Sequence, residues 1–179
     1  MIDLSLYNLT LGRTLEGAAE WFRPVLDRGR GAALIDTGFL RAMIDENDQY
    51  AFDARKYYDD SAPSTHFYTT SLVLAETVRQ IAKGKPRGGH VDYAMRQRWF
   101  DQCSEILIDR TYVFVCHPPR ELLISAYQEL RATRQIMPSL DLCDALSVSV
   151  LDYAQHRRVF GFDGHFNTFG AQVEPLLTI

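Results

Sequence analysis

The sequence predicts an α/β fold, a three-layer α/β/α sandwich around a parallel sheet of about five strands. Along the chain, short runs rich in β-branched and aromatic residues alternate with longer stretches of helical periodicity. Strands that alternate with helices form βαβ units, and right-handed crossovers then cover both faces of a parallel sheet. The composition, with 46% hydrophobic and 23% charged residues, is ordinary for a folded domain.

Each element of this fold corresponds to one run. In chain order, the strand candidates are residues 32–35, 66–69, 112–116 and 159–162, and residues 172–175 could add a last strand. The helix candidates are residues 52–61, 71–83, 90–104, 119–133 and 141–156. In such a sheet, functional side chains gather at the edge formed by the carboxyl ends of the strands.

The length of 179 residues suits one domain with a short extension. Residues 1–30 have some helical periodicity and end in a basic segment with two glycines, Arg28 to Gly31. We therefore expect a partly helical N-terminal extension over residues 1–30 and the main domain over residues 31–179.

Charge and cysteine content exclude several classes of protein. The net charge of −4 lacks the basic excess typical of nucleic-acid-binding proteins, so only local charge could attract RNA. Cys103, Cys116 and Cys143 lie far apart without a C-x-x-C pair, which argues against a disulfide scaffold and a zinc site. Cys116 and Cys143 lie in apolar runs and are expected to be buried.

The sequence also lacks the signals of export and membrane insertion. The first residues show no basic segment followed by an apolar stretch, so no signal peptide is expected. No apolar run approaches the roughly 20 residues that span a bilayer. We expect a cytoplasmic protein without a membrane segment.

Four acidic residues from separate segments are expected to meet at the carboxyl edge of the sheet. Asp36 ends the first strand and Asp163 ends the fourth. Glu76 lies early in the helix that leaves the second strand. Asp144 lies in the first turn of a helix that must begin at this edge, because it ends where the fourth strand starts.

Neighbouring carboxylates repel one another unless they are protonated or neutralised by a cation. The natural cation is Mg²⁺ or Mn²⁺, which prefers oxygen ligands and keeps several waters. Such an ion activates a bound water and stabilises charge on phosphorus, so the pattern indicates metal-dependent phosphodiester hydrolysis. No histidine stands where a conventional base is expected, and His165 is the nearest candidate.

Each acid also has a purely structural interpretation. Asp36 and Asp163 could be turn residues, since each is followed closely by glycine. Glu76 could be a solvated charge on its helix. With Asp141 as N-cap, Asp144 would occupy the third helical position, where an acid stabilises the helix terminus.

Taken together, four segments of the sequence resemble the PIN-domain nucleases, and most closely the VapC-type toxins of bacterial toxin–antitoxin pairs. The resemblance spans about residues 32–176, and its motifs are residues 33–37, 69–76, 139–148 and 162–166. It departs from the usual family pattern at Gly38, where Ser or Asn is common, and at Gly161, where Thr is common.

The resemblance implies a five-stranded parallel sheet and a metal-dependent endoribonuclease. It assigns the roles of metal ligands to the four acids, Asp36, Glu76, Asp144 and Asp163, and a supporting or water-positioning hydroxyl to Thr37. It also implies an RNA substrate, a cognate antitoxin protein and a homodimer.

A local cluster of basic residues offers a path for RNA. Residues 79–98 carry six basic side chains against one acid, whereas residues 45–60 show the opposite bias. From this segment we assign RNA contacts to Arg79, Lys83, Lys85 and Arg87. The alternative is an ordinary solvated helix face.

Two other functions remain open for this sequence. One is a PIN-like module that binds RNA or a protein without cleavage, and the other is a housekeeping RNA-processing nuclease. A phosphatase or response-regulator fold shares the acid at the first strand. It is disfavoured because no second acid lies two residues after Asp36 and no lysine is suitably placed.

Overall fold

The computed structural model describes residues 31–83, 93–108, 113–154 and 157–175. The expected extension over residues 1–30 lies outside this part of the chain. The described residues form one parallel sheet of five strands in the order β3-β2-β1-β4-β5. The strands are β1 (Gly31–Ile35), β2 (Thr65–Thr70), β3 (Phe114–Cys116), β4 (Arg158–Phe160) and β5 (Gln172–Glu174).

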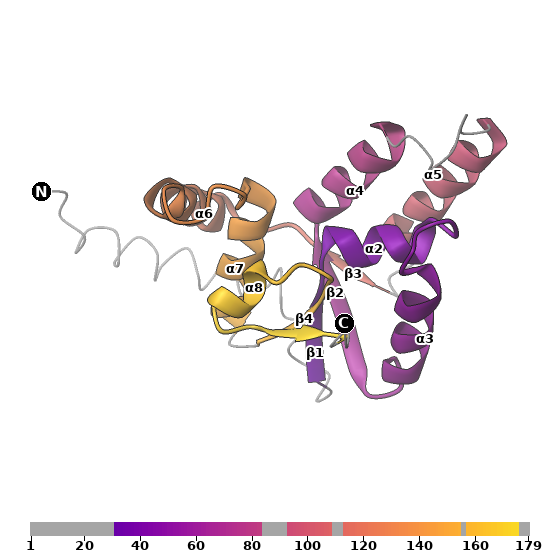
Figure 1. The fold of residues 1–179 in the computed structure, drawn as a ribbon, viewed down its shortest axis with the longest axis horizontal. Coiled ribbons are helices and arrows are strands. Elements are labelled where there is room, and N and C mark those ends of the chain that lie inside the picture. Colours follow the sequence, from indigo (N-terminus) through magenta and orange to yellow (C-terminus); the bar gives the residue numbers. More distant parts are fainter. Residues whose placement is uncertain (1–30, 84–92, 109–112, 155–156, 176–179) are drawn as a thin grey trace, which may run out of the picture.

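Helices cover the sheet on two sides (Figure 1). Helices α2 to α5 lie on one side of the strands and α6 to α8 on the other. Their bounds are α2 (Thr37–Ile44), α3 (Ala51–Ser61), α4 (Ser71–Lys83), α5 (Tyr93–Ile108), α6 (Arg120–Thr133), α7 (Leu142–Ala154) and α8 (His165–Thr168). The predicted α/β/α sandwich with a five-stranded parallel sheet is confirmed.

The central strand β1 shows why two cores form. Successive side chains of a strand point to opposite faces, so a strand with helices on both sides must be apolar throughout. Ala33 and Ile35 pack into the core beneath α2, α3 and α4, while Ala32 and Leu34 pack into the core beneath α6 and α7. All four are almost fully buried.

The strand order places a topological switch point between β1 and β4. The chain runs from β1 outward to β2 and β3, and then crosses to the other side of β1 for β4 and β5. At such a point the loops after the two central strands diverge and leave a crevice, where ligands of open α/β sheets bind. The backbone N–H of Asp36 donates to the carbonyl of Phe160 at 2.9 Å and closes this end of the β1–β4 pair.

Three details of the expected element pattern were wrong, and one of them is the short helix α8, which was not predicted. Helix α2 was not predicted, although Asp36 as N-cap and apolar residues at 39, 40, 43 and 44 mark it in retrospect. Strand β4 ends at Phe160, so Asp163 lies three residues beyond the strand instead of ending it. Gly161 and Phe162 fill that interval.

No helix within the described part of the chain has the length and apolar character needed to cross a membrane. The three cysteines are buried and form no disulfide, as expected for Cys116 and Cys143. Burial raises the pKa of the Cys116 thiol to about 12, which leaves it protonated near neutral pH.

The aromatic ring of Phe160 is central to the core beneath α2 and α3. It is fully buried and lies 4.9 Å from the ring of Phe67, 5.0 Å from that of Tyr57 and 5.3 Å from that of Phe39. We expect Phe160→Ala to lower the free energy of unfolding by roughly 3–5 kcal/mol, measured by urea denaturation. Phe52, which is 77% exposed, is the control, and Phe52→Ala should change it by less than about 0.5 kcal/mol. Equal effects of the two substitutions would contradict this account of the core.

Candidate active site

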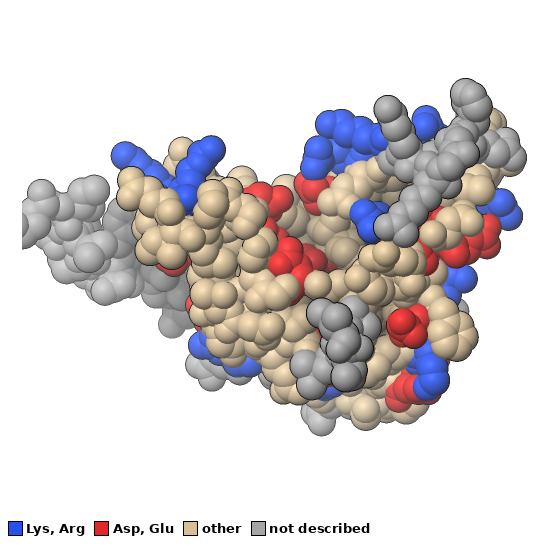
Figure 2. Space-filling model, viewed as in Figure 1, with Lys and Arg blue, Asp and Glu red and all other residues tan. Residues whose placement is uncertain are grey.

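A pocket of about 530 Å³ opens at the carboxyl edge of the sheet, beside the switch point. We call it the carboxylate pocket, and it is lined by Asp36, Thr37, Gly38, Arg41, Glu76, Gln80, Ser139, Asp141, Cys143, Asp144, Phe162, Asp163 and Gly164. All four acids expected at this edge therefore line one pocket. In Figure 2, acidic side chains gather near the centre of the face, with basic side chains on either side, over α4 and α6.

Asp36 is the most deeply placed of these acids. It follows β1 directly, is only 6% exposed, and serves as the N-cap of α2 by accepting from the Gly38 N–H at 3.4 Å. The pKa of Asp36 is raised to about 7, mainly by burial and to a smaller extent by the charges of Asp144 and Asp163. The backbone N–H groups of Thr37 and Gly38 act in the opposite direction. The turn interpretation is thus correct in part, but burial beside two other acids exceeds what a turn requires.

Glycine at position 161 gives the Asp36 side chain its room. A Cβ placed on Gly161 would lie 3.3 Å from the Asp36 Cβ and 3.6 Å from its Oδ2. A threonine at this position would crowd the carboxylate unless one of the two side chains shifted. Glycine in place of threonine at this position therefore changes the surroundings of Asp36 directly.

Asp144 lies at the third position of α7, where it takes part in the hydrogen bonds that cap the helix N-terminus. Asp141 accepts from the backbone N–H groups of Cys143 and Asp144 at 2.7 and 3.0 Å. In return, Asp144 Oδ2 accepts from the Asp141 N–H at 3.1 Å, which completes a capping box. Burial raises the pKa of Asp144 to about 6, with smaller contributions from Asp141 and Asp163. The capping interpretation is confirmed, and the same carboxylate still lines the pocket.

Asp163 is the most exposed of the three aspartates Asp36, Asp144 and Asp163, with 45% of its side chain accessible. Its Oδ1 accepts from the His165 backbone N–H at 2.9 Å and lies 3.0 Å from the ring Nδ1 of that histidine. The other ring nitrogen, Nε2, is 2.9 Å from the Ser139 hydroxyl. Asp163, His165 and Ser139 therefore link the loop after β4 to the loop before α7.

Glu76 lines the same pocket but differs in its electrostatics. Its Oε1 forms an ion pair with Arg79 and accepts from Gln80 Nε2 at 3.0 Å. These two hydrogen bonds, with Arg79 the stronger influence, lower the pKa of Glu76. The expectation that Glu76 belongs to a set of mutually repelling acids is therefore not met in this arrangement, because Arg79 neutralises it.

The three coupled carboxylates, Asp36, Asp144 and Asp163, determine which ion could bind here. Among the residues that the structure describes, no three His, Cys, Asp or Glu side chains form a ready metal site. The three acids offer only oxygen atoms, which suits Mg²⁺ or Mn²⁺. Mg²⁺ often binds through one or two carboxylates and completes its shell with water or phosphate oxygens. The donor set therefore fits such an ion without a complete protein cage.

Thr37 lies behind the acids at the first position of α2. It is 8% exposed, and its hydroxyl is 3.9 Å from the Cys143 Sγ. Burial raises the pKa of the Cys143 thiol well above its usual range, so it does not act as a nucleophile near neutral pH.

Of the four residues predicted to contact RNA, two lie in the described part of the chain and two lie outside it. Arg79 and Lys83 lie on α4, and Arg79 is already paired with Glu76. Lys85 and Arg87 lie outside the described residues. Figure 2 shows further basic side chains over α6, on the other side of the acidic centre, which the sequence analysis had not considered.

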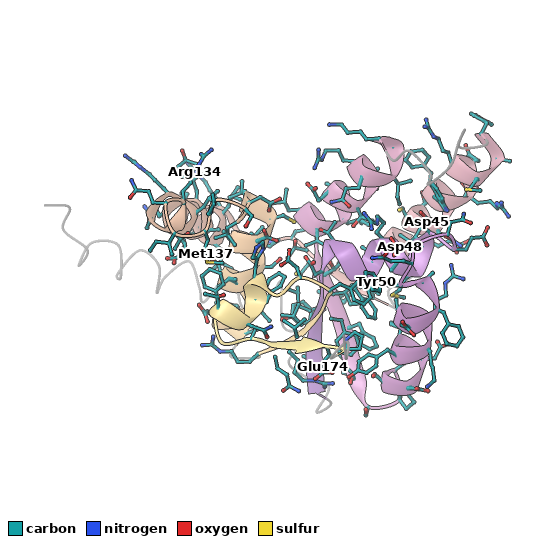
Figure 3. The ribbon with its side chains drawn as sticks, in the orientation of Figure 1. Asp45, Asp48, Tyr50, Arg134, Met137 and Glu174 are labelled. Atoms are coloured by element: carbon teal, nitrogen blue, oxygen red, sulfur yellow. The ribbon has the colours of Figure 1, made fainter. Side chains whose placement is uncertain are left out.

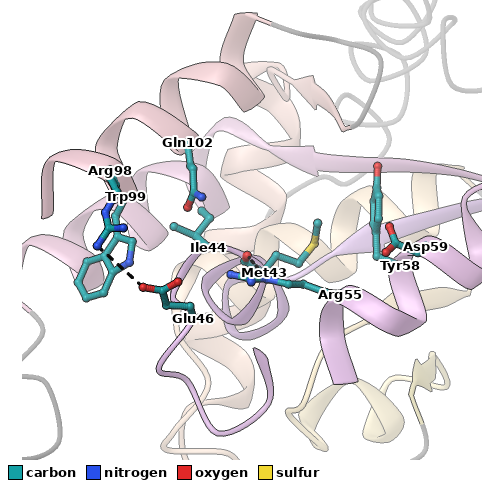
Figure 4. A pocket seen from close by; sticks show the side chains of 9 residues that line it. All are labelled: Met43, Ile44, Glu46, Arg55, Tyr58, Asp59, Arg98, Trp99 and Gln102. Carbon is teal, nitrogen blue, oxygen red and sulfur yellow. Dashed lines mark hydrogen bonds and ion pairs between the residues drawn. The ribbon is translucent and has the colours of Figure 1, made fainter. Parts of the chain in front are cut away.

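A second pocket lies between α2, α3 and α5 (Figure 4). It has a volume of about 380 Å³ and is lined by Met43, Ile44, Glu46, Arg55, Tyr58, Asp59, Arg98, Trp99 and Gln102. Its acidic and basic residues are equal in number, and Arg98 pairs with Glu46 at 3.9 Å. This pocket lacks the clustered acids of the carboxylate pocket.

Comparison with known proteins identifies the fold. No protein-family model matches the sequence, and no curated protein matches it. Among solved structures, VapC20 of Mycobacterium tuberculosis, a toxin that cleaves the sarcin–ricin loop, is similar with a TM-score of 0.64. The two chains are 21% identical, and the similarity covers 78% of this chain and 96% of VapC20. The chain has a PIN-like fold. The resemblance noted in the sequence is thereby confirmed at the level of fold.

Three polar residues of the pocket were missed by the sequence analysis. Gln80 follows Glu76 by four residues on α4, a spacing that places both on one helix face. Arg41 follows Thr37 by four residues on α2 and was missed because that helix was not predicted. Ser139 lies in an irregular loop, where no periodic signal exists.

The raised pKa of Asp36 predicts a pH dependence of stability. The folded protein retains the proton up to about pH 7, whereas the unfolded chain loses it near pH 4. The stabilising contribution is therefore complete below about pH 4 and is lost as the pH rises to 7. Relative to Asp36→Asn, which retains a good N-cap, the parent should lose roughly 2–4 kcal/mol of unfolding free energy between pH 4 and 8.

Urea denaturation in EDTA at several pH values measures this difference. Asp53→Asn, at an exposed acid in the first turn of α3, is the control and should give a curve parallel to that of the parent. If the Asp36→Asn curve also ran parallel to that of the parent, the pKa of the Asp36 carboxyl would not be raised as described.

Proposed function

We propose that this protein is a divalent-metal-dependent endoribonuclease, and that it acts as the toxin of a toxin–antitoxin pair. The observation that carries the proposal is the coupling of Asp36, Asp144 and Asp163 in one open pocket at the switch point of a PIN-like fold. A module that only binds RNA gains nothing from clustered carboxylates, which repel one another and repel phosphate. A metal-dependent nuclease needs them.

The roles of the residues follow from their positions. Asp36, Asp144 and Asp163 would hold Mg²⁺ or Mn²⁺, and the bound ion supplies an activated water and neutralises charge on the scissile phosphate. The rigid N-terminus of α2 orients Asp36, and the capping box orients Asp144. Thr37 lines the same pocket next to Asp36, and its hydroxyl would position a water.

Glu76 has a distinct role in this proposal. It is the fourth acidic residue of the pocket, and it is held by Arg79 and Gln80. In the absence of RNA, the positive charge of Arg79 neutralises it. If Arg79 turned to a phosphate, Glu76 would be free to help hold the ion. Arg79 and Glu76 are thus assigned to the same step of substrate binding.

The biological role rests on the likeness to VapC20, which is described as a toxin. We propose a cognate antitoxin that masks the carboxylate pocket, a homodimeric assembly and a cytoplasmic location. Coexpression with the product of the neighbouring gene tests the first of these. The neighbour should relieve a growth defect caused by the chain alone, whereas harmless expression of the chain alone would favour a housekeeping nuclease.

Asp144→Asn tests the metal-dependent chemistry. We expect cleavage of a structured RNA to fall at least a hundredfold, because a ligand that positions the ion has no substitute at that point. The rise in melting temperature with added Mg²⁺ should shrink as ion affinity weakens. Initial cleavage rates and thermal melts across a Mg²⁺ titration measure both effects.

The matched control is Asp152→Asn, at an exposed acid near the other end of α7. This variant should cleave RNA and respond to Mg²⁺ like the parent. Cleavage by the parent that persists in excess EDTA would refute metal dependence. Normal cleavage by Asp144→Asn would leave Asp144 as a helix cap alone.

The basic face of α4 is proposed to contact RNA phosphates. If Lys83 neutralises one phosphate, Lys83→Gln should lower the slope of log affinity against log salt concentration by about one. Binding would be measured on the Asp144→Asn background at several salt concentrations. Lys56→Gln, on α3 and paired with Asp60, is the control and should leave the slope unchanged. If Lys83→Gln also left the slope unchanged, the basic side of α4 would be an ordinary solvated helix face that does not contact RNA.

A further inference from the structure

The carboxylate pocket must admit a phosphodiester although its own acids repel it. Within the described chain, Arg41 is the one lysine or arginine among the residues that line this pocket. It lies on α2, one turn after Thr37 and close to the N-cap Asp36. Arg41 therefore adds a positive charge to the wall of a pocket that is otherwise lined by acidic, polar and apolar residues.

Arg41 is held in place from behind by a buried acid. Its Nε and Nη2 donate to Asp48 Oδ2 at 3.0 and 2.7 Å, and the Asp48 side chain is only 6% exposed. The other oxygen of Asp48 accepts from the Tyr50 backbone N–H at 3.0 Å. Figure 3 shows Asp48 and Tyr50 on the turn between α2 and α3. The guanidinium is thus fixed before any ligand arrives.

A second contact connects Arg41 to Glu76 through Gln80. Its Nη1 donates to Gln80 Oε1 at 3.3 Å, and Gln80 Nε2 donates to Glu76 Oε1 at 3.0 Å. Three residues on two helices therefore form one chain of hydrogen bonds along the wall of the pocket. The position of the guanidinium depends on the arrangement around Glu76.

This anchoring leaves part of the guanidinium unused. A guanidinium carries five N–H groups, and the contacts to Asp48 and Gln80 engage three of them. One N–H on each terminal nitrogen remains, and 43% of the Arg41 side chain is exposed. An arginine that served only to join α2 to the following turn would not need to line the pocket.

We propose that Arg41 binds a nonbridging oxygen of the RNA phosphodiester held in the carboxylate pocket. This inference rests on the proposed ribonuclease function and adds a substrate-binding residue to it. Two N–H groups on a planar, fixed cation match the oxygens of a phosphate, which a lysine ammonium does not do in the same way. Asp48 holds the cation rigid, and the phosphate takes the side that faces the pocket.

The test is the affinity for a single-stranded oligonucleotide with 2′-deoxy linkages, together with cleavage of the matching RNA. Arg41→Gln should weaken the affinity by roughly tenfold to a hundredfold, as expected when a charge-assisted hydrogen bond is lost. Arg41→Lys, which keeps the charge, should recover part of this loss. Arg55→Gln is the control, because Arg55 also anchors to the fold, through the Met43 carbonyl at 3.0 Å, outside the carboxylate pocket. It should bind like the parent.

Arg41→Gln leaves Asp48 buried without its partner, so folding must be checked. The double variant with Asp48→Asn removes that charge, and its urea midpoint and affinity are measured in parallel. If either folded variant binds the oligonucleotide as tightly as the parent, Arg41 is only a clamp between α2 and the next turn, and the proposal is overturned.

The outcomes also separate this proposal from the ribonuclease function. If the parent cleaves RNA and Arg41→Gln cleaves it equally well, only the role of Arg41 is overturned. Arg41-dependent binding without cleavage by the parent overturns the hydrolytic function and retains the phosphate contact. A parent that neither binds nor cleaves overturns both.

Discussion

The burial of one carboxylate, Asp36, is the constraint on which the rest of the pocket depends. It lies where β1 ends, α2 begins and β4 passes alongside, so three elements fix its position. Burial and two neighbouring acids make its charge costly. The surrounding core of buried aromatic and aliphatic side chains supplies the stability that offsets this cost. A local arrangement that opposes stability is typical of a functional site.

Much of the fold could be predicted because parallel strands and amphipathic helices have different periods. The strand runs and the position of Asp36 follow from those periods and from the rule about the carboxyl edge. Helix α2 was missed because Gly38 interrupts its first turn. Arg79 was assigned to RNA and Glu76 to the metal, although their spacing of three residues on a helix allows them to pair. Contacts of this kind depend on which rotamers a folded surface favours, and periodicity does not report them.

The two interpretations of Asp144 are compatible, and the structure explains why. The N-terminus of α7 carries a partial positive charge and unpaired N–H groups, which favour a carboxylate at this place. The same terminus points toward the carboxylate pocket, so one side chain can complete a cap and contribute charge to the pocket. A helix N-terminus therefore stabilises an acid whose charge would otherwise cost free energy. Sequence alone presents the two roles as alternatives because each predicts the same residue at the same position.

The pairing of β1 with β4 has a consequence for how the protein is made. These strands are adjacent in the sheet but come from opposite ends of the described chain, and β4 can join only after the intervening elements have been synthesised. Asp163 follows β4, so a chain that is still emerging from the ribosome lacks one wall of the pocket. A chain that ends before β4 contains Asp36 and Asp144 but lacks Asp163 and the strand that pairs with β1. The carboxylate pocket is therefore complete only after β4 and the loop that carries Asp163 have been made.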